Sequence, residues 1–220
     1  MKTLAAIQPS FFPWRGYFDI IQSCDVFIFY DHVQYDKNGW RNRNRVLING
    51  KEQWITLPIK YEKINKKIKD VQIFNSERNL NKILNTLKSS YGRHPNFKKI
   101  YPVLFNIFKM KKWNLLSELN IVLTKEVCKL LKIKSNFIIS SNLKNINDKN
   151  LNLVNLCKQF NCDNYLSGKS AKSYLDENLF VSNGINVIWH EYEDKIYNQF
   201  NNNNFFFEKL SILDYLFNIK

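Results

Sequence analysis

The stretch LAAIQPSFFPWRGYFDIIQSCDVFIF, residues 4–29, decides the fold. Its two ends, residues 4–7 and 26–29, are short apolar runs bounded by turn residues, which is typical of buried parallel strands. Between them, apolar residues recur at helical spacing, at Tyr17, Phe18, Ile20 and Ile21. A strand, a proline-containing loop, a helix and a second strand predict a βαβ unit with a right-handed crossover.

The rest of the chain continues with a helical middle segment and a return to alternating strands and helices. The patterns predict strands at 71–74, 136–139, 164–166 and 185–189, and helices at 79–90, 96–109, 115–132, 150–160 and 208–217. A polar loop is expected at 201–204. We therefore predict a single α/β domain over residues 1–220 with a mostly parallel sheet.

A β-hairpin is predicted after the second strand, because Asn49-Gly50 separates two apolar runs at 46–48 and 54–57. The string WRNRNR, residues 40–45, leads into its first arm. Side chains alternate along a strand, so Arg41, Arg43 and Arg45 are expected to share one face. Such a face suits a diphosphate or polyanion, although an isolated arginine triplet is more often a solvated surface.

The candidate site lies at the carboxyl ends of the predicted strands, where parallel sheets bind their ligands. We expect one pocket to gather Gln8, Ser10, Trp14, Tyr17, Asp31, Gln34, Tyr35 and Ser167. Ser167 begins the SGKS turn, Ser167, Gly168, Lys169 and Ser170, which is expected to bind the substrate. A small-residue turn there presents backbone N–H groups to a phosphate, although such a turn is by itself often a helix cap.

Three titratable side chains are the catalytic candidates, namely Asp31, His32 and His94. His94 stands in a Gly/Pro corner and has a helix-end hydrogen-bonding role as its alternative. Stacking on a sugar or base is expected from Trp14, Tyr17, Tyr35 and Trp40, with core packing as the alternative. Arg41 and Arg43 are expected to hold phosphates, and Asn42 is a further substrate-binding candidate. The sequence has no metal-ligand cluster and no nucleophile elbow, which disfavours metal-dependent and covalent catalysis.

The chain is strongly cationic, with 33 Lys and Arg against 19 Asp and Glu, a net charge of +14. Nucleic acid, an anionic membrane and phosphorylated substrates all fit this charge. Abundant Lys and Asn also indicate an AT-rich genome, so we discount the charge as evidence for a specific nucleic-acid partner. No signal peptide or transmembrane stretch is recognised, and the four cysteines look like reduced core thiols, which predicts a cytoplasmic protein.

Four motifs in order, QPSFFPWRGYFD, DHVQYx4WRNRNR, YLSGKSAKSYL and LSILDYLFN, resemble the WbqC-like proteins of bacterial O-antigen and capsule loci. The likeness runs from Ile7 to Asn218 and implies a role in polysaccharide biosynthesis. The family usually carries a second acid where this chain has His32. The chain also resembles the H-x-G-H nucleotidyltransferases, because Trp14 to Tyr17 occupy the position of that motif after the first strand. Both histidines of the motif are replaced here, so the resemblance implies a shared Rossmann-like fold more than adenylyl transfer.

The resemblance implies a cytoplasmic transferase that modifies a nucleotide-diphosphate amino sugar, by acyl or aminoacyl transfer to a sugar amine. The donor would be a CoA or acyl-carrier thioester, with an acyl carrier protein as a partner. The alternative is a non-catalytic nucleotide-sugar or nucleic-acid binding module with a degenerate nucleotidyltransferase-like fold. The apolar terminal helix either packs on the sheet or forms a homodimer interface.

Overall fold

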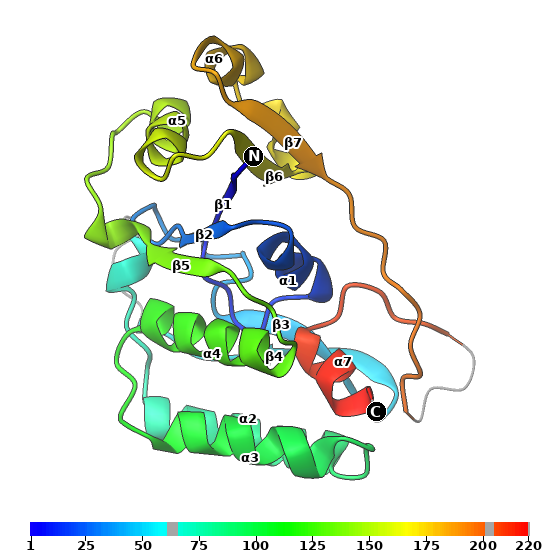
Figure 1. Cartoon of the computed structure of the whole chain (residues 1–220). Helices are drawn as coiled ribbons and strands as arrows, with labels where there is room; N and C mark the ends of the chain where they lie inside the picture. Colours follow the sequence, from blue (N-terminus) through cyan, green and yellow to red (C-terminus); the bar gives the residue numbers. More distant parts are fainter. Residues whose placement is uncertain (61–65, 201–204, 220) are drawn as a thin grey trace. The chain divides into compact units, whose positions relative to one another are not determined.

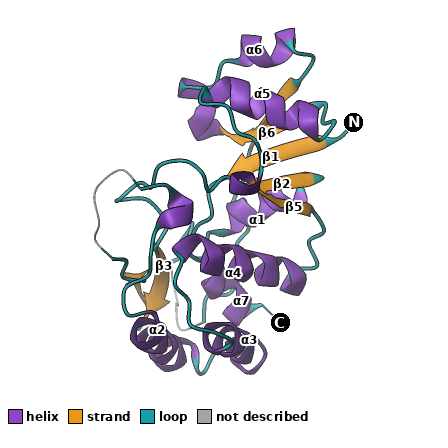
Figure 2. Cartoon of the chain, turned by 90° about the vertical axis from the view of Figure 1, so that its left-hand side faces the viewer, coloured by secondary structure: helices purple, strands orange, loops and turns teal. Residues whose placement is uncertain are grey.

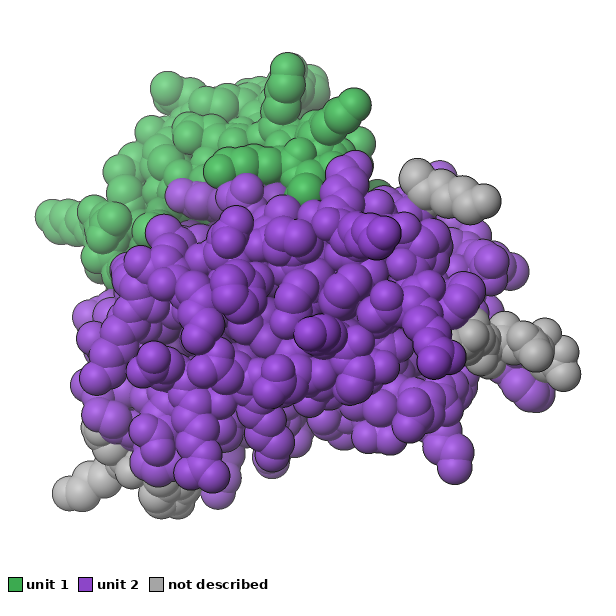
Figure 3. Space-filling model, turned by 90° about the horizontal axis from the view of Figure 1, so that it is seen from below, with its two compact units in different colours: residues 1–8, 16–32, 128–193 green, residues 9–15, 33–127, 194–220 purple. Residues whose placement is uncertain are grey.

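The computed structural model describes residues 1–60, 66–200 and 205–219 (Figure 1). The chain forms two compact units, coloured separately in Figure 3. Unit 1 comprises residues 1–8, 16–32 and 128–193, and unit 2 comprises residues 9–15, 33–127 and 194–220. A division into compact units does not show whether the chain is one domain, so the single domain expected over residues 1–220 stays a prediction. The expected loop at 201–204 lies outside the described residues.

Unit 1 is built on a five-stranded parallel sheet, which confirms the predicted α/β class. Its strands are β1 (Thr3–Ile7), β2 (Val26–Phe29), β5 (Asn136–Ile139), β6 (Asn164–Gly168) and β7 (Asn186–His190). Their order across the sheet is β5-β2-β1-β6-β7, and every pair is parallel. The chain adds strands first on one side of β1 and then on the other. The β1/β6 junction is therefore the topological switch point, where ligands bind in such sheets.

Helices cover both faces of this sheet. Figure 2 shows α5 (Lys149–Gln159) and α6 (Glu177–Ser182) on one side, and α1 (Arg15–Gln22) on the other. On the α5 and α6 side, Val26 and Ile28 pack with Val154, Leu156 and Phe180 in an aliphatic core. The alternate residues of β2 point the other way, and the ring of Phe27 contacts those of Tyr17, Phe29 and Phe137. Because side chains alternate along β2, its single apolar run contributes to the core on each face of the sheet.

Unit 2 combines the predicted hairpin with a helical layer. The hairpin strands are β3 (Arg43–Ile48) and β4 (Lys51–Thr56), and Ile48 pairs with Lys51 across the turn. Both turn residues have positive φ, 52° at Asn49 and 72° at Gly50, as a type I′ turn requires. The helices are α2 (Ser76–Tyr91), α3 (Phe97–Lys109), α4 (Leu116–Leu130) and α7 (Ile212–Asn218). The last three residues of α4 belong to unit 1.

Three predicted elements differ from the structure. Residues 71–74 form no strand and make isolated bridges, Gln72 to Leu115 and Ile73 to Ile59. The terminal helix begins at Ile212 instead of residue 208, because Ser211 is its N-cap and accepts a hydrogen bond from Leu213 N. Strand β6 continues through Gly168, so the expected SGKS turn begins inside a strand and leads into a 3₁₀ turn, η3 (Lys169–Ser173).

All four cysteines are buried free thiols, which confirms the prediction of reduced core residues. Burial raises the pKa of Cys24, Cys128 and Cys157 to about 12, so these thiols stay protonated at neutral pH. None of the helices in the described part of the chain has the length and apolar character that a bilayer crossing needs.

Candidate functional site

Asp31 anchors a polar network at the carboxyl ends of β2 and β5. Its Oδ1 accepts hydrogen bonds from Ser140 Oγ at 3.0 Å and from Ser141 N at 2.9 Å. Its Oδ2 accepts from Ser141 Oγ at 2.8 Å. Asp31 is buried, with 3% of its surface exposed, so these hydroxyl and amide donors replace the water that a carboxylate would otherwise bind.

The same hydroxyl of Ser140 orients His32. Ser140 Oγ lies 2.7 Å from His32 Nδ1, and it also accepts a hydrogen bond from Asp31 N at 3.0 Å. A hydroxyl has one proton, and Ser140 donates it to the Asp31 carboxylate. His32 Nδ1 is therefore assigned as the N–H donor, which places the lone pair of the neutral ring on Nε2. The imidazole also packs edge-on against the Tyr30 ring, 4.5 Å between centroids.

At the switch point, Gln8 directly follows β1 and Gly168 is the last residue of β6. The carbonyl of Gln8 accepts a hydrogen bond from Tyr17 Oη at 3.2 Å, while the Tyr17 ring packs in the aromatic core. Gly168 has ordinary extended geometry, φ −71° and ψ 149°. A Cβ added there would meet nothing nearer than Ser170 Oγ at 3.9 Å. Neither conformation nor packing requires glycine at this position, and its missing side chain leaves open space at the end of β6.

Lys169 and Ser170 follow in η3, and Ser167 stands buried before them. Lys169 Nζ lies 2.6 Å from Glu191 Oε1, and both side chains are more than half exposed. This ion pair lowers the pKa of Glu191, but on an exposed surface it contributes little to stability. Lys169 is thus held beside the carboxyl ends of β6 and β7 in a position that solvent can reach.

His190 is a site candidate that sequence reasoning missed. It closes β7 in register with Gly168, and its Nε2 lies 2.7 Å from Asp19 Oδ2 of α1. The signal available in the sequence was a histidine that ends an apolar strand, but its acidic partner lies 171 residues away. The pair adds a second imidazole to the carboxyl edge of the unit 1 sheet.

In unit 2, Arg41 is the centre of a buried polar cluster. Its Nη1 donates to Ser10 Oγ at 2.6 Å, and its Nε donates to Asp36 Oδ1 at 3.0 Å. The backbone carbonyl of Arg41 accepts from Asn120 Nδ2 at 2.8 Å. Asn120, on α4, is fully buried and was not among the predicted residues. Arg41 thus ties the loop after β1 to the approach of the hairpin.

The neighbouring asparagines also bind the backbone. Asn42 accepts a hydrogen bond from Tyr35 Oη at 3.0 Å and donates to the Leu57 carbonyl at 3.1 Å. Asn44, which was not predicted, donates to the carbonyls of Phe11 and Phe12 at 3.2 and 2.7 Å. Phe12 has a strained φ of 43°, and these contacts hold it there.

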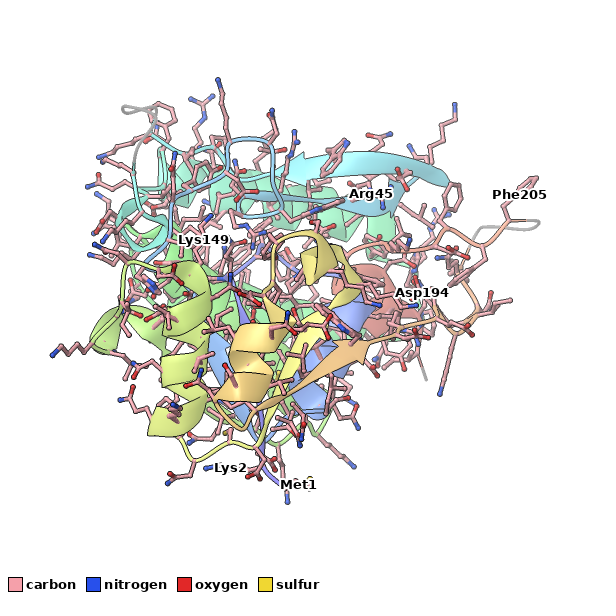
Figure 4. The ribbon with its side chains drawn as sticks, turned by 90° about the horizontal axis from the view of Figure 1, so that it is seen from above. Met1, Lys2, Arg45, Lys149, Asp194 and Phe205 are labelled. Atoms are coloured by element: carbon pink, nitrogen blue, oxygen red, sulfur yellow. The ribbon has the colours of Figure 1, made fainter. Side chains whose placement is uncertain are left out.

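The exposed face of the hairpin carries two arginines and two tryptophans. The guanidinium carbon of Arg43 lies 4.6 Å above the Trp54 ring, and that of Arg45 lies 5.5 Å above the Trp40 ring. The two indoles pack against each other at 5.2 Å. Figure 4 labels Arg45 on this hairpin. Arg43 and Arg45 therefore share a face as expected, but Arg41 precedes the strand and makes the buried contacts given above.

His94 lies in the helical layer of unit 2. Its Nδ1 is 3.0 Å from Asn218 Oδ1, and its ring contacts those of Tyr91 and Phe200. Burial lowers its pKa from the usual 6.5, which favours the neutral ring. These contacts support the helix-end alternative, and the catalytic role of His94 stays a prediction.

The predicted residues divide between the units. Unit 1 holds Gln8, Tyr17, Asp31, His32 and Ser167 to Ser170, while unit 2 holds Ser10, Trp14, Gln34, Tyr35, Trp40 to Arg43 and His94. Within unit 2, Trp14 bridges to Ser211 and Gln34 bridges to Lys67. The single pocket expected to gather both sets stays a prediction.

Over residues 1–60, 66–200 and 205–219, no group of three or more His, Cys, Asp or Glu side chains is arranged to hold a metal ion. The carboxyl edge of unit 1 instead offers a carboxylate, two imidazoles and several hydroxyls. These groups can bind, orient and move protons.

Comparison with known proteins places the chain in a family. The family model described as the WbqC-like protein family matches residues 8–220. An uncharacterised protein of Mycobacterium tuberculosis is 36% identical over 221 residues, which cover 100% of this chain and 94% of that protein. No solved structure matches the chain. The chain belongs to the WbqC-like protein family.

Proposed function

We propose that this protein is a cytoplasmic transferase of polysaccharide biosynthesis that acylates the amine of a nucleotide-linked amino sugar. The observation that carries the proposal is the network Asp31–Ser140–His32 at the carboxyl edge of the parallel sheet. It holds an imidazole in one tautomer at the carboxyl ends of β2 and β5, on the sheet edge where such folds bind their ligands. Membership in a family encoded at polysaccharide loci supports the choice of substrate.

The proposed reaction needs a base. The amine nitrogen attacks the carbonyl carbon of a CoA or acyl-carrier thioester, a C–N bond forms, and the C–S bond breaks. The attacking nitrogen must lose a proton, and the departing thiolate gains one. His32 Nε2 takes the proton from nitrogen and passes it to sulfur, so atoms and charge balance. Ser140 and Asp31 stabilise the imidazolium that forms between these steps.

The nucleotide-diphosphate is proposed to lie against Gly168 and the basic residue after it. The open space at Gly168 permits close approach of a phosphate to the backbone. Lys169 stands next in the chain and is solvent-accessible. An exposed ammonium can turn from Glu191 to a phosphate at low cost, because the surface ion pair is weak.

Calorimetry with UDP-, dTDP- and GDP-amino sugars tests the proposal, with a single-stranded oligonucleotide as the comparison at physiological salt. We expect one nucleotide sugar to bind in the micromolar range and the others to bind more weakly. The ligand that binds then enters a transfer assay with acyl-CoA and acyl-carrier thioesters, read as free thiol released.

Two results would contradict the proposal in different ways. If no nucleotide sugar binds, the substrate class is wrong. If one binds but no thioester releases thiol beyond its rate without protein, the chain is a nucleotide-sugar binding module instead of a transferase.

A further inference from the structure

The two units differ in charge to an extent that composition alone does not explain. Unit 1 contains nine Lys and Arg and nine Asp and Glu, so its formal net charge is zero. Unit 2 contains 24 basic and 10 acidic residues and therefore carries the entire net charge of +14. An AT-rich genome would enrich lysine in both units. The segregation indicates that the positive charge of unit 2 serves an anionic partner.

The charge is densest in residues 76–112, which comprise α2, α3 and the chain that joins and follows them. This segment has nine basic residues and one acid, Glu77. All nine basic side chains are exposed: Arg78, Lys82, Lys88, Arg93, Lys98, Lys99, Lys109, Lys111 and Lys112. Among the described residues, Lys111 has a carboxylate partner in Glu118, and no ion pair involves the other eight. We call these nine residues, with Tyr101, Phe105 and Met110, the α2–α3 surface.

Helix α3 places apolar groups in the middle of this charge. Lys98, Tyr101, Phe105 and Lys109 follow one another at intervals of three and four residues and so share one face. The Tyr101 ring contacts the Phe105 ring at 6.5 Å and the Phe97 ring at 4.7 Å. Phe105 is 43% exposed and Met110 is 64% exposed.

The opposite face of α3 is already used for packing. Ile100, Leu104, Ile107 and Phe108 are all buried. The exposed Phe105 and Met110 are therefore not needed for the core of unit 2. On this second face the exposed Phe105 and the half-buried Tyr101 lie between lysines, a combination that resembles the surface of a membrane-bound helix. Figure 3 shows unit 2 from below, the side on which α2 and α3 lie in Figure 1.

We propose that the α2–α3 surface docks on an anionic phospholipid bilayer, with Phe105 and Met110 entering the headgroup boundary and the lysines contacting lipid phosphates. Seven of the nine charges are lysines, which attract phosphate as mobile point charges without the planar fork that reads bases. The apolar residues lie along an exposed helix, and single strands are usually bound in a groove lined with open ring faces. These features favour lipid over nucleic acid. The proposal is independent of the reaction proposed for unit 1.

Vesicle sedimentation with the full chain tests this proposal. The probes are neutral phosphatidylcholine vesicles and vesicles that contain 30% phosphatidylglycerol. We expect binding to the anionic vesicles that weakens as salt rises. The triple variant Lys98→Glu, Lys99→Glu, Lys109→Glu should lower the partition coefficient at least about a hundredfold, because the loss of each basic residue near such a surface removes about a fivefold factor and each glutamate adds repulsion. Phe105→Ala should lower it about threefold at unchanged net charge.

The matched control places the same charge change on unit 1, in Lys132→Glu, Lys134→Glu, Lys144→Glu. These three lysines are also exposed, and both triple variants change the net charge from +14 to +8. The control should bind within twofold of wild type. Equal losses in the two triple variants would show diffuse charge attraction and overturn the proposal. Tight binding of a single-stranded oligonucleotide, with no binding to anionic vesicles, would overturn it in favour of nucleic acid.

Discussion

The two units use buried polar groups differently. In unit 1, Asp31 is held by hydroxyl and amide donors at the open edge of a sheet, close to an imidazole with an assigned tautomer. In unit 2, Arg41 and Asn44 hold loops together by bonds to a hydroxyl, a carboxylate and backbone carbonyls. We propose that the first arrangement exchanges a proton with a ligand, whereas the second stabilises loop geometry. A polar motif in the sequence therefore has to be judged by the groups that its side chains bind in the fold.

The largest expected effect is on chemistry in unit 1. His32→Asn keeps an N–H donor for Ser140 but has no base, so the transfer rate should fall about 10²- to 10⁴-fold. Ser140→Ala removes the group that selects the tautomer, and a fall of about tenfold is expected. Thiol release under saturating substrate measures both, and calorimetry checks that the nucleotide sugar still binds. Normal turnover by His32→Asn would remove His32 from the mechanism.

The next effect is on stability in unit 2. Arg41→Ala removes a buried guanidinium and its hydrogen bond to the buried Ser10, while its other partner Asp36 is 49% exposed and can bind water, so the change should cost about 2 kcal/mol of unfolding free energy. Arg43→Ala loses a partly exposed contact with Trp54 and should cost about 0.5 kcal/mol. Urea unfolding at pH 7 measures both values. Similar costs for the two variants would contradict the distinct role given to Arg41.

Substituting one glycine in each unit by alanine should give smaller effects of opposite kind, on ligand binding in unit 1 and on stability in unit 2. Gly168→Ala meets open space at a compatible φ, so it should leave stability unchanged or raise it by about 0.5 kcal/mol. The same variant should weaken nucleotide-sugar binding about tenfold, because the methyl group fills the proposed phosphate position. Gly92→Ala in unit 2 places a Cβ 2.5 Å from the Lys88 carbonyl and should destabilise by about 1 kcal/mol. Unchanged binding by Gly168→Ala would contradict the proposed ligand position.

The smallest effect concerns pH. Burial lowers the pKa of His94 below 6.5, so the neutral ring stabilises the fold above that pH. This contribution is lost as pH falls through the lowered pKa of the folded state. His94→Gln keeps a donor for Asn218 without a group that titrates in this range. Between pH 7.5 and 5.5, the unfolding free energy of wild type should therefore fall more than that of the variant. Parallel curves would show that His94 is not buried as a neutral ring.

Much of the fold could be predicted because its signals are local. The Asn49-Gly50 pair specifies a turn with two positive φ angles, and the apolar run at 26–29 is the whole of β2. The strand expected at 71–74 was wrong. These residues form only isolated bridges to residues 59 and 115, and the local sequence pattern does not show how many partners a segment will have. A short helix was expected after the SGKS turn without bounds, because the six residues of α6 are too few to show a helical period.

The residues of the candidate site could be predicted only where they follow the end of a strand. Asp31 and His32 follow an apolar run directly, and the rule for parallel sheets singles them out. Their partner Ser140 lies about 110 residues further along the chain, directly after β5, and it reaches Asp31 only because β5 pairs with β2 in the sheet. Asn120 lies within a helix and Asn44 lies within the arginine-rich string at 40–45. Both were missed because the sequence around an asparagine does not indicate which distant carbonyl it will bind.

The strand order of unit 1 has a consequence for synthesis on the ribosome. Strands β1 and β2 are near neighbours in sequence and form the middle of the sheet, but β5 and β6 follow more than 100 and 130 residues after β2. A nascent chain can therefore pair its central strands early, with both of their outer edges open until late in translation. Such apolar edges invite pairing with other chains. We expect chaperone binding during synthesis to persist until β6 has left the ribosome.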